Sequence, residues 1–292
     1  MSVDLVTIGQ YLTNGVFLFS VYGLVAVGLT LIFGILEVVN FAHGEFYMLS
    51  AYIAYFLFGV LGWNYPAAVV AAVLIMAAFG IVVNRTLILP VFERSFQAAI
   101  ITTLGLSMIL QNSVLVVAGA TPLALNLSWS NQPISIFGIF LTYQKLLILG
   151  TSVLAFLLLN VFVKQTKIGK AMRAVSQNKE ACSVVGIDIR RIAMITFAVG
   201  AGITAVAGSL VAPLFIISPT MGAPLTLKAF AIVIAGGMGN VIGGIYMAFI
   251  VGMSESILGA FFPEYVNGIS FAILIAVLML RPEGLLGRKV GI

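Results

Sequence analysis

Long runs without a charged side chain occupy most of the chain. A helix of about 20 apolar residues is long enough to cross a bilayer, so each run can supply one or two membrane spans. The uncharged runs cover residues 5–36, 46–84, 95–144, 146–163 and 192–227. The apolar pattern predicts about eight spans, at residues 8–34, 46–61, 66–89, 97–118, 146–163, 192–217, 241–262 and 265–280.

The apolar runs also predict the fold class. Backbone N–H and C=O groups inside a membrane must bond within the protein, which leaves helices or a closed β-barrel. Strands of such a barrel alternate polar and apolar residues, whereas the runs here are continuously apolar. We therefore expect an all-α, polytopic membrane helix bundle of roughly 8–10 spans, with possible half-helices. Residues 224–239 are apolar but short and end in a glycine-rich stretch, so they predict either a half-helix or a ninth span.

Composition places this bundle in a membrane. Of the 292 residues, 62% are hydrophobic and 8% are charged, whereas soluble domains carry about 25% charged residues. Asp4 precedes the first span and no Lys or Arg occurs before Arg85, so we do not expect a cleavable signal with a basic start. Cys182 is the single cysteine, and the sequence has no CxxC or histidine cluster. We therefore predict neither an internal disulfide nor a metal site.

Basic residues are concentrated in one long loop, residues 164–191, which holds seven of the fourteen Lys and Arg residues. The C-terminal tail adds Arg281, Arg288 and Lys289, whereas residues 119–144 carry no charge. Because cytoplasmic segments are enriched in Lys and Arg, we predict that the loop and the tail are cytoplasmic and that residues 119–144 lie on the far side. The same rule places Arg85 and Arg94 in the cytoplasm, and strict alternation of spans then places the N-terminus outside.

The basic loop carries helix signals as well as charge. Ile168, Met172 and Val175 recur at helical spacing, which predicts an amphipathic helix lying at the membrane surface. A second, seven-residue helix is predicted between an N-cap at Asn178 and a C-cap at Gly186. A helix this short is marginal in water, so we expect it to pack against a partner protein.

Several ionisable side chains lie in or near apolar runs, namely Glu37, His43, Glu45, Lys228 and Glu255. An unpaired charge in lipid costs at least about 2.5 kcal/mol, so each should have a partner or face a cavity. Glu255 lies deep within a predicted span, and both a structural hydrogen bond and a gating role stay open for it.

Small residues form two further patterns. Gly200, Thr204, Gly208 and Ala212 recur every four residues, which predicts a ridge against which a neighbouring helix packs. The glycines of residues 236–244 either break helices along a transport path or allow tight helix packing. The sequence leaves both interpretations of the second pattern open.

Two motifs in this chain resemble those of a known family. The sequence NFAHGE at residues 40–45 resembles a signature that LivH-type members of the bacterial branched-chain amino acid ABC permeases carry after their first span. The sequences KIGKAMRAV at residues 167–175, NKEA at 178–181 and GID at 186–188 resemble the cytoplasmic loop of the same family. The similarity runs over nearly the whole chain and the motifs occur in the same order.

The resemblance implies a single transmembrane permease domain, residues 1–292, in which residues 164–191 form a cytoplasmic coupling loop. In this family the short loop helix docks into a groove of an ATPase subunit. The implied coupling residues are Asn178, Lys179, Glu180, Ala181, Val184, Val185, Gly186 and Asp188. As a hypothesis, we assign the translocation path to Asn40, Phe41, His43, Gly44, Glu45, Gly236, Gly237, Gly239, Asn240 and Glu255.

The resemblance also implies partners and a substrate. It implies two ATPase subunits, a second related permease chain and an extracytoplasmic substrate-binding protein, assembled among the lipids of the bacterial inner membrane. A heterodimer of permeases is expected, with a homodimer still open. The implied substrates are branched-chain amino acids, with urea, amides and other amino acids as alternatives. No contact with nucleic acid is expected.

Three classes of function make different demands on such a membrane chain. The chain has no GxxxxGK[ST] phosphate loop, so we expect that it binds no cofactor, that it is not an enzyme and that ATP is used by the partner subunits. An ion-coupled secondary transporter would need charges near the midplane and inverted repeats, for which Glu255 and Lys228 are a weak match. A membrane enzyme would need a convergent catalytic set, which one histidine does not provide. We therefore predict an importer permease.

Overall fold

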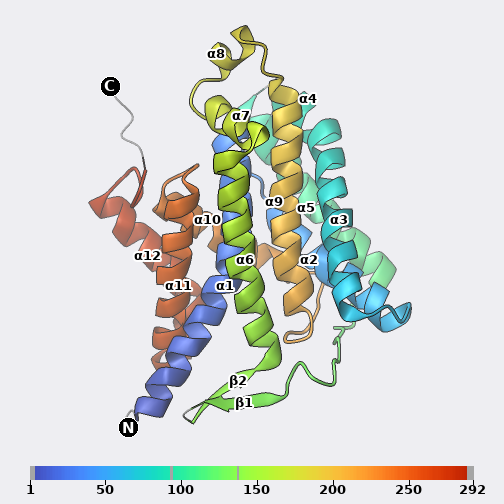
Figure 1. Cartoon of the computed structure of the whole chain (residues 1–292), viewed down its shortest axis with the longest axis vertical. Coiled ribbons are helices and arrows are strands. Elements are labelled where there is room, and N and C mark those ends of the chain that lie inside the picture. The colour runs from blue at the N-terminus through green and yellow to red at the C-terminus, as the bar shows by residue number, and fades with distance from the viewer. Residues whose placement is uncertain (1–3, 93–94, 137, 288–292) are drawn as a thin grey trace.

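The computed structural model describes residues 4–92, 95–136 and 138–287 and is a bundle of helices (Figure 1). Within these residues, seven helical segments are long and apolar enough to cross a membrane. They are α1 (Leu5–Leu36), α3 (Tyr65–Val83) with η2 (Asn84–Ile88) and α4 (Leu89–Phe92), α5 (Phe96–Ala118), α6 (Tyr143–Gln165), α9 (Ile189–Val211), α11 (Val241–Phe261), and η3 (Pro263–Tyr265) with α12 (Val266–Leu280). The predicted all-α membrane bundle is confirmed. Arg94, Arg288 and Lys289 lie outside the described residues.

Helices α1 and α9 form the centre of the bundle. Their most apolar windows are 78% and 67% buried, against 11% for α12. The predicted ridge of α9 explains this central packing. A Cβ on Gly200 would come within 2.8 Å of the Gly28 carbonyl oxygen on α1, and a Cβ on Gly208 would collide with the Tyr47 backbone. Small side chains therefore allow the backbones of three helices to approach closely.

Two apolar segments cross only part of the bundle as helices. The predicted span at residues 46–61 is α2 (His43–Tyr55) followed by η1 (Phe56–Val60), and α10 (Gly222–Gly236) covers most of residues 224–239. Non-helical chain precedes each of them, at residues 37–42 and 212–221. The ambiguous segment at residues 224–239 is thus a half-helix. The irregular segment that precedes it is only partly covered, because Ala212 and Ile217 are buried whereas Phe215 and Ile216 are 53% and 65% exposed.

The two half-helices begin beside each other and run in opposite directions. Their first turns meet at Gly44 and Gly222, where a Cβ on Gly222 would lie 2.5 Å from the Gly44 carbonyl oxygen. Helix α2 leads to α3, whose first residue Tyr65 contacts the ring of Trp129. Helix α10 leads to Gly239, which packs on Gly34 near the last turn of α1.

The two ends of the bundle differ in structure (Figure 1). At one end lies an antiparallel hairpin of β1 (Pro133–Ile136) and β2 (Ile139–Thr142), with Ile134 paired to Leu141. The first turns of α1 lie here too, since Gln10 Nε2 donates to the Phe140 carbonyl, 3.0 Å away. At the opposite end, drawn uppermost, lie α7 (Lys167–Val175) and α8 (Lys179–Val184) of the basic loop. We call these the hairpin end and the basic end.

Candidate functional site

Helix α7 packs on the ends of the central helices. Met172 and Val175 are buried in a cluster with Ile35 of α1 and Ile192 of α9, whereas Ile168 is exposed. The predicted amphipathic helix is present. Most of its apolar side packs on protein rather than on a membrane surface, because the ends of α1 and α9 offer apolar side chains there.

Helix α8 has both of the predicted caps. The Asn178 side chain accepts a hydrogen bond from the Ala181 N–H, 2.8 Å away. At the other end the N–H of Ile187 donates to the Cys182 carbonyl at 3.0 Å and that of Gly186 to the Ser183 carbonyl at 3.2 Å. This is a Schellman motif, and it requires the left-handed φ of +82° that Gly186 adopts.

The next helix, α9, is also capped as predicted, because Asp188 Oδ1 accepts from the Arg191 N–H at 3.0 Å. The loop thus contains a short helix with a sharply defined start and stop. Glu180 lies in its first turn, where the helix dipole favours a negative charge.

One side of α8 is anchored and the other is open. Cys182 is buried against Ile187 and neighbouring α7 residues, so the lone thiol serves packing here. Val184 and Val185 are 86% and 73% exposed, and Ala181 is exposed as well. Lys179 Nζ lies 3.3 Å from Glu37 Oε1, and this ion pair links α8 to the end of α1. Glu37 is the C-cap of α1 and has a left-handed φ of +56°.

The junction of the two half-helices holds the NFAHGE motif. His43 is fully buried, with its Nε2 3.1 Å from the Val25 carbonyl and 2.8 Å from Thr204 Oγ1. The Gly44 N–H donates to Thr226 Oγ1 of α10 at 2.9 Å. The motif therefore joins α2 to α1, α9 and α10 at one place.

Glu45 places a buried carboxylate at this junction. Its Oε1 accepts from Ser107 Oγ at 2.9 Å and from Gln111 Nε2 at 2.7 Å, both on α5. Its Oε2 has no hydrogen-bond partner among the described residues and lies close to Gly222. The first turns of α2 and α10, whose dipoles present their positive ends, both lie at this carboxyl group.

The remaining residues of the motif shape the entry to α2. Asn40 is buried, and its Oδ1 accepts from the Ala42 N–H at 3.1 Å, which turns the chain into the helix. The Phe41 ring packs on Phe230 of α10, with ring centroids 5.0 Å apart. Asn40 thus serves a local turn, and its place in the predicted translocation path stays a prediction.

The glycine-rich stretch lies elsewhere, at the basic end. Gly236 packs on the Gly243 backbone, and Gly237, with φ of +102°, packs on Gly287. Asn240 caps α11 by accepting from the Gly243 N–H at 3.1 Å. The structure therefore does not bring Gly236, Gly237, Gly239 and Asn240 together with His43, Gly44 and Glu45, and close helix packing accounts for these glycines.

Glu255 is part of a buried polar group near the middle of the bundle. Its Oε2 lies 2.9 Å from Lys228 Nζ of α10 and accepts from the Tyr22 hydroxyl at 2.7 Å. Lys228 Nζ also donates to the Tyr22 oxygen at 3.2 Å. The sequence indicated that Glu255 and Lys228 needed partners, but nothing in it pointed to Tyr22, which lies 206 residues from Lys228.

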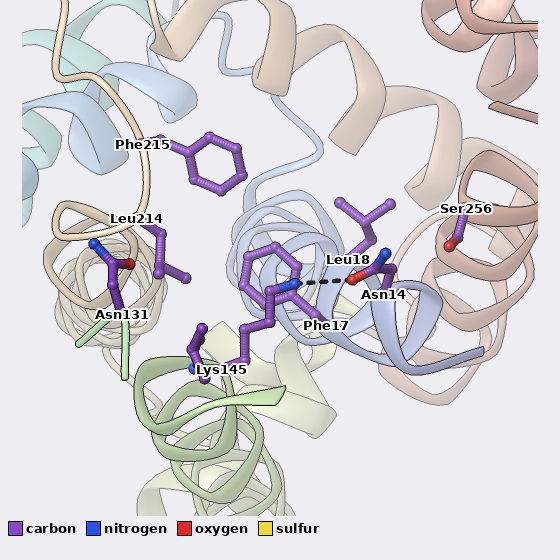
Figure 2. Close-up of a pocket in the computed structure, with 9 residues that line it drawn as sticks. Asn14, Phe17, Leu18, Asn131, Lys145, Leu214, Phe215 and Ser256 are labelled. Atoms are coloured by element: carbon purple, nitrogen blue, oxygen red, sulfur yellow. Dashed lines mark hydrogen bonds between the residues drawn. The ribbon is translucent and has the colours of Figure 1, made fainter. Parts of the chain in front are cut away.

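Two neighbouring cavities open on the hairpin side of this group. One, of about 320 Å³, is lined by Tyr22 and Lys228 among mostly apolar side chains. The other, of about 490 Å³, is lined by Asn14 and Lys145 and shares Phe17, Leu18 and Phe215 with the first. Figure 2 shows the second cavity, with Lys145 Nζ bonded to Asn14 Oδ1 at 2.8 Å. Among the described residues that line these cavities, the charged side chains are those of Lys145 and Lys228.

Metal ligands do not gather anywhere in the part of the chain that the structure describes, where no three His, Cys, Asp or Glu side chains lie close enough to hold an ion. The polar groups of the bundle are thus arranged for packing, ion pairing and hydrogen bonding.

Comparisons with known proteins add a family to this geometry. A family described as the permease component of the branched-chain amino acid transport system matches residues 11–278. The chain is 34% identical to the high-affinity branched-chain amino acid transport system permease protein LivH of Escherichia coli, over 96% of this chain and 95% of LivH. It is also 24% identical to LivM of the same organism, over 91% of this chain and 68% of LivM. A solved structure of PsaBC from Streptococcus pneumoniae in complex with Fab matches with a TM-score of 0.50 at 14% identity, over 94% of this chain and 93% of that chain.

Proposed function

Because this chain belongs to the branched-chain amino acid permease family, we propose that it is the membrane-spanning subunit of an ATP-driven importer that carries leucine, isoleucine and valine into the cytoplasm. LivH, which is similar along nearly its whole length, is named for this class of substrate. The chain itself acts as a transport subunit, and ATP is hydrolysed by partner chains.

The observation that carries the proposal is helix α8. It has six residues, a cap at each end and two outward valines that are 86% and 73% exposed. A helix this short is unstable alone. Exposed apolar side chains at the basic end, which we place outside the membrane, favour a protein partner. We propose that α8 docks into an ATPase subunit through Val184 and Val185, and that Asn178, Gly186 and Asp188 hold its shape.

The assembly follows from this role. Two ATPase subunits would dock on two copies of such a helix, one from this chain and one from a second, related permease. The similarity of this chain to both LivH and LivM supports a pair of related permeases. A binding protein outside the bacterial inner membrane would deliver the amino acid at the hairpin end. In this arrangement the basic end and the C-terminus face the cytoplasm, as the clustering of Lys and Arg favours.

The junction at Gly44 and Gly222 is the proposed centre of conformational change along the path. Broken helices that meet within a bundle are used by transporters where the path must open and close. Glu45 and His43 belong to this junction, whereas the stretch from Gly236 to Asn240 is proposed to stabilise the basic end.

Reconstitution tests the proposal directly. This chain would be co-purified with its ATPase, second permease and binding protein, placed in proteoliposomes and supplied with radiolabelled leucine. We expect uptake that requires both ATP and the binding protein. Uptake by this chain alone, driven by an ion gradient without ATPase, would refute the importer assignment. Uptake of urea or an amide in place of leucine would retain the importer and change its substrate.

A further inference from the structure

We propose that the cavity beside Lys228 is a binding site for the transported amino acid, in which the Lys228 ammonium holds the α-carboxylate and apolar side chains hold the hydrophobic side chain. This inference rests on the proposed function and adds a residue-level substrate site to it. Lys228 lies outside the translocation path predicted from the sequence.

The Lys228 ammonium has capacity for a ligand. It carries three N–H donors, and two have partners among the described residues, the Glu255 carboxylate at 2.9 Å and the Tyr22 hydroxyl at 3.2 Å. Its side chain is 11% exposed and lines the cavity of about 320 Å³, whereas Glu255 is 1% exposed and does not line it. A ligand in the cavity therefore meets the positive member of the ion pair, and the negative member lies behind it.

Glu255 and Tyr22 hold that ammonium in place. Both bond to it, and the Nζ atom lies 5.2 Å from the centre of the Tyr22 ring. Burying a lone lysine would be costly, and the ion pair removes the net charge. A zwitterionic amino acid adds no net charge when it enters, so the site stays neutral with or without it. We assign Glu255 and Tyr22 as positioning residues.

The other walls suit a hydrophobic side chain. Apolar residues dominate them, and the volume lies at the small end of the range for small-molecule sites. The lining residues include Leu18, Val21, Val211 and Leu225, and the exposed amide of Asn267 is an acceptor that the substrate ammonium could use. Tyr22 lies near the middle of α1, a depth at which transporters commonly hold their substrates.

In this proposal the substrate reaches the site through the second cavity (Figure 2), whose lining includes Thr142 of the hairpin. Lys145 in this cavity lies over an aromatic ring, as Lys228 does, with its Nζ 5.5 Å from the centre of the Phe17 ring. Phe17, Leu18 and Phe215 line both cavities, so the two cavities are direct neighbours. A carboxylate that enters from the hairpin end would meet Lys145 first and Lys228 deeper in the bundle.

A purely structural ion pair between α10 and α11 is the competing explanation, and a charge swap separates the two. The variant with both Lys228→Glu and Glu255→Lys keeps an ion pair but presents a carboxylate to the cavity. In the complete transporter in proteoliposomes, we expect it to assemble and to lose at least tenfold in leucine uptake, roughly the value of one hydrogen bond to a charged group. Lys228→Arg should keep most of the uptake. Wild-type uptake in the swapped variant would overturn the site and leave the importer assignment intact.

A labelling experiment keeps the test valid if the swapped variant does not assemble. Cys182 is the single cysteine, so a Cys182→Ser, Ile216→Cys transporter would carry one thiol per copy of this chain, at a residue that is 65% exposed and lines the cavity. Millimolar leucine should slow its modification by a charged thiol reagent several-fold, and isopentylamine, which lacks the carboxylate, should not. Equal protection by both compounds, or by neither, would overturn the role of Lys228. Absence of leucine uptake by the wild-type complex would instead refute the proposed function.

Discussion

Replacing Gly186 with valine tests whether the shape of α8 matters for transport. Gly186 has φ of +82°, and a Cβ placed on it would have no heavy atom within 4 Å. The substitution therefore introduces backbone strain without a steric clash. Valine is branched at Cβ and is a clear outlier in this region of conformational space.

The expected size of the effect follows from that strain. The left-handed conformation costs an ordinary L-residue roughly 1–2 kcal/mol, which is a factor of about 5–30 in an equilibrium constant. Helix α8 has six residues and is held by its caps and by Cys182. A shift of this size should therefore leave α8 frayed for much of the time, while the membrane spans stay intact.

The assay compares leucine uptake with ATP hydrolysis in the reconstituted transporter. For Gly186→Val we expect normal amounts in the membrane, uptake reduced several-fold and fewer leucine molecules moved per ATP. Gly186→Asn is the matched control, because asparagine tolerates the left-handed conformation, and it should stay close to wild type. Normal coupling in the valine variant would refute the docking role of α8. Equal loss in both variants would show that side-chain bulk, rather than φ, is responsible.

Three further predictions concern packing, charge and capping. Gly44→Ala should lower the melting temperature of the solubilised protein, since overpacking costs typically 1–3 kcal/mol, whereas Gly105→Ala, with open space around it, should not; equal melting temperatures would contradict the close approach at Gly44. Glu37→Lys should change stability little, because exposed ion pairs are worth about 0–1 kcal/mol. It should nevertheless reduce ATP-coupled uptake, and adding Lys179→Glu should recover it; no recovery would exclude the ion pair as the cause. Asn240→Ala should destabilise the protein by about 0.5–2 kcal/mol through loss of the α11 cap, measured by thermal unfolding, while Asn240→Asp keeps the cap acceptor and should lose less.

Local features of the site were predictable from the sequence. The caps at Asn178, Gly186 and Asp188 depend on residues a few positions apart, and all of them are present. The predicted translocation path combined residues 40–45, residues 236–240 and Glu255, and the fold places these three in different surroundings. Glycines at a helix break look alike in sequence whether they line a path or pack against a neighbour, and the surroundings of Gly236 show the second case.

Partners distant in sequence could not be predicted. Tyr22 and Glu255 lie 233 residues apart and Gly44 and Thr226 lie 182 apart, yet each pair shares a hydrogen bond. No periodicity within α1, α2, α10 or α11 specifies which turn of one helix meets which turn of another. Their positions depend on how small residues on α9, such as Gly200 and Gly208, allow the central backbones to approach.

The sequence by itself determined that this chain is a helical membrane bundle, where its long spans lie and where its basic loop starts and stops a short helix. Those properties depend on the apolar length needed to cross a bilayer and on caps within single turns, which are local. Only the tertiary structure decided that α2 and α10 are half-helices that meet at their first turns, and that Lys228 faces a cavity with Glu255 behind it. These features depend on contacts between helices, and close packing in three dimensions selects those contacts.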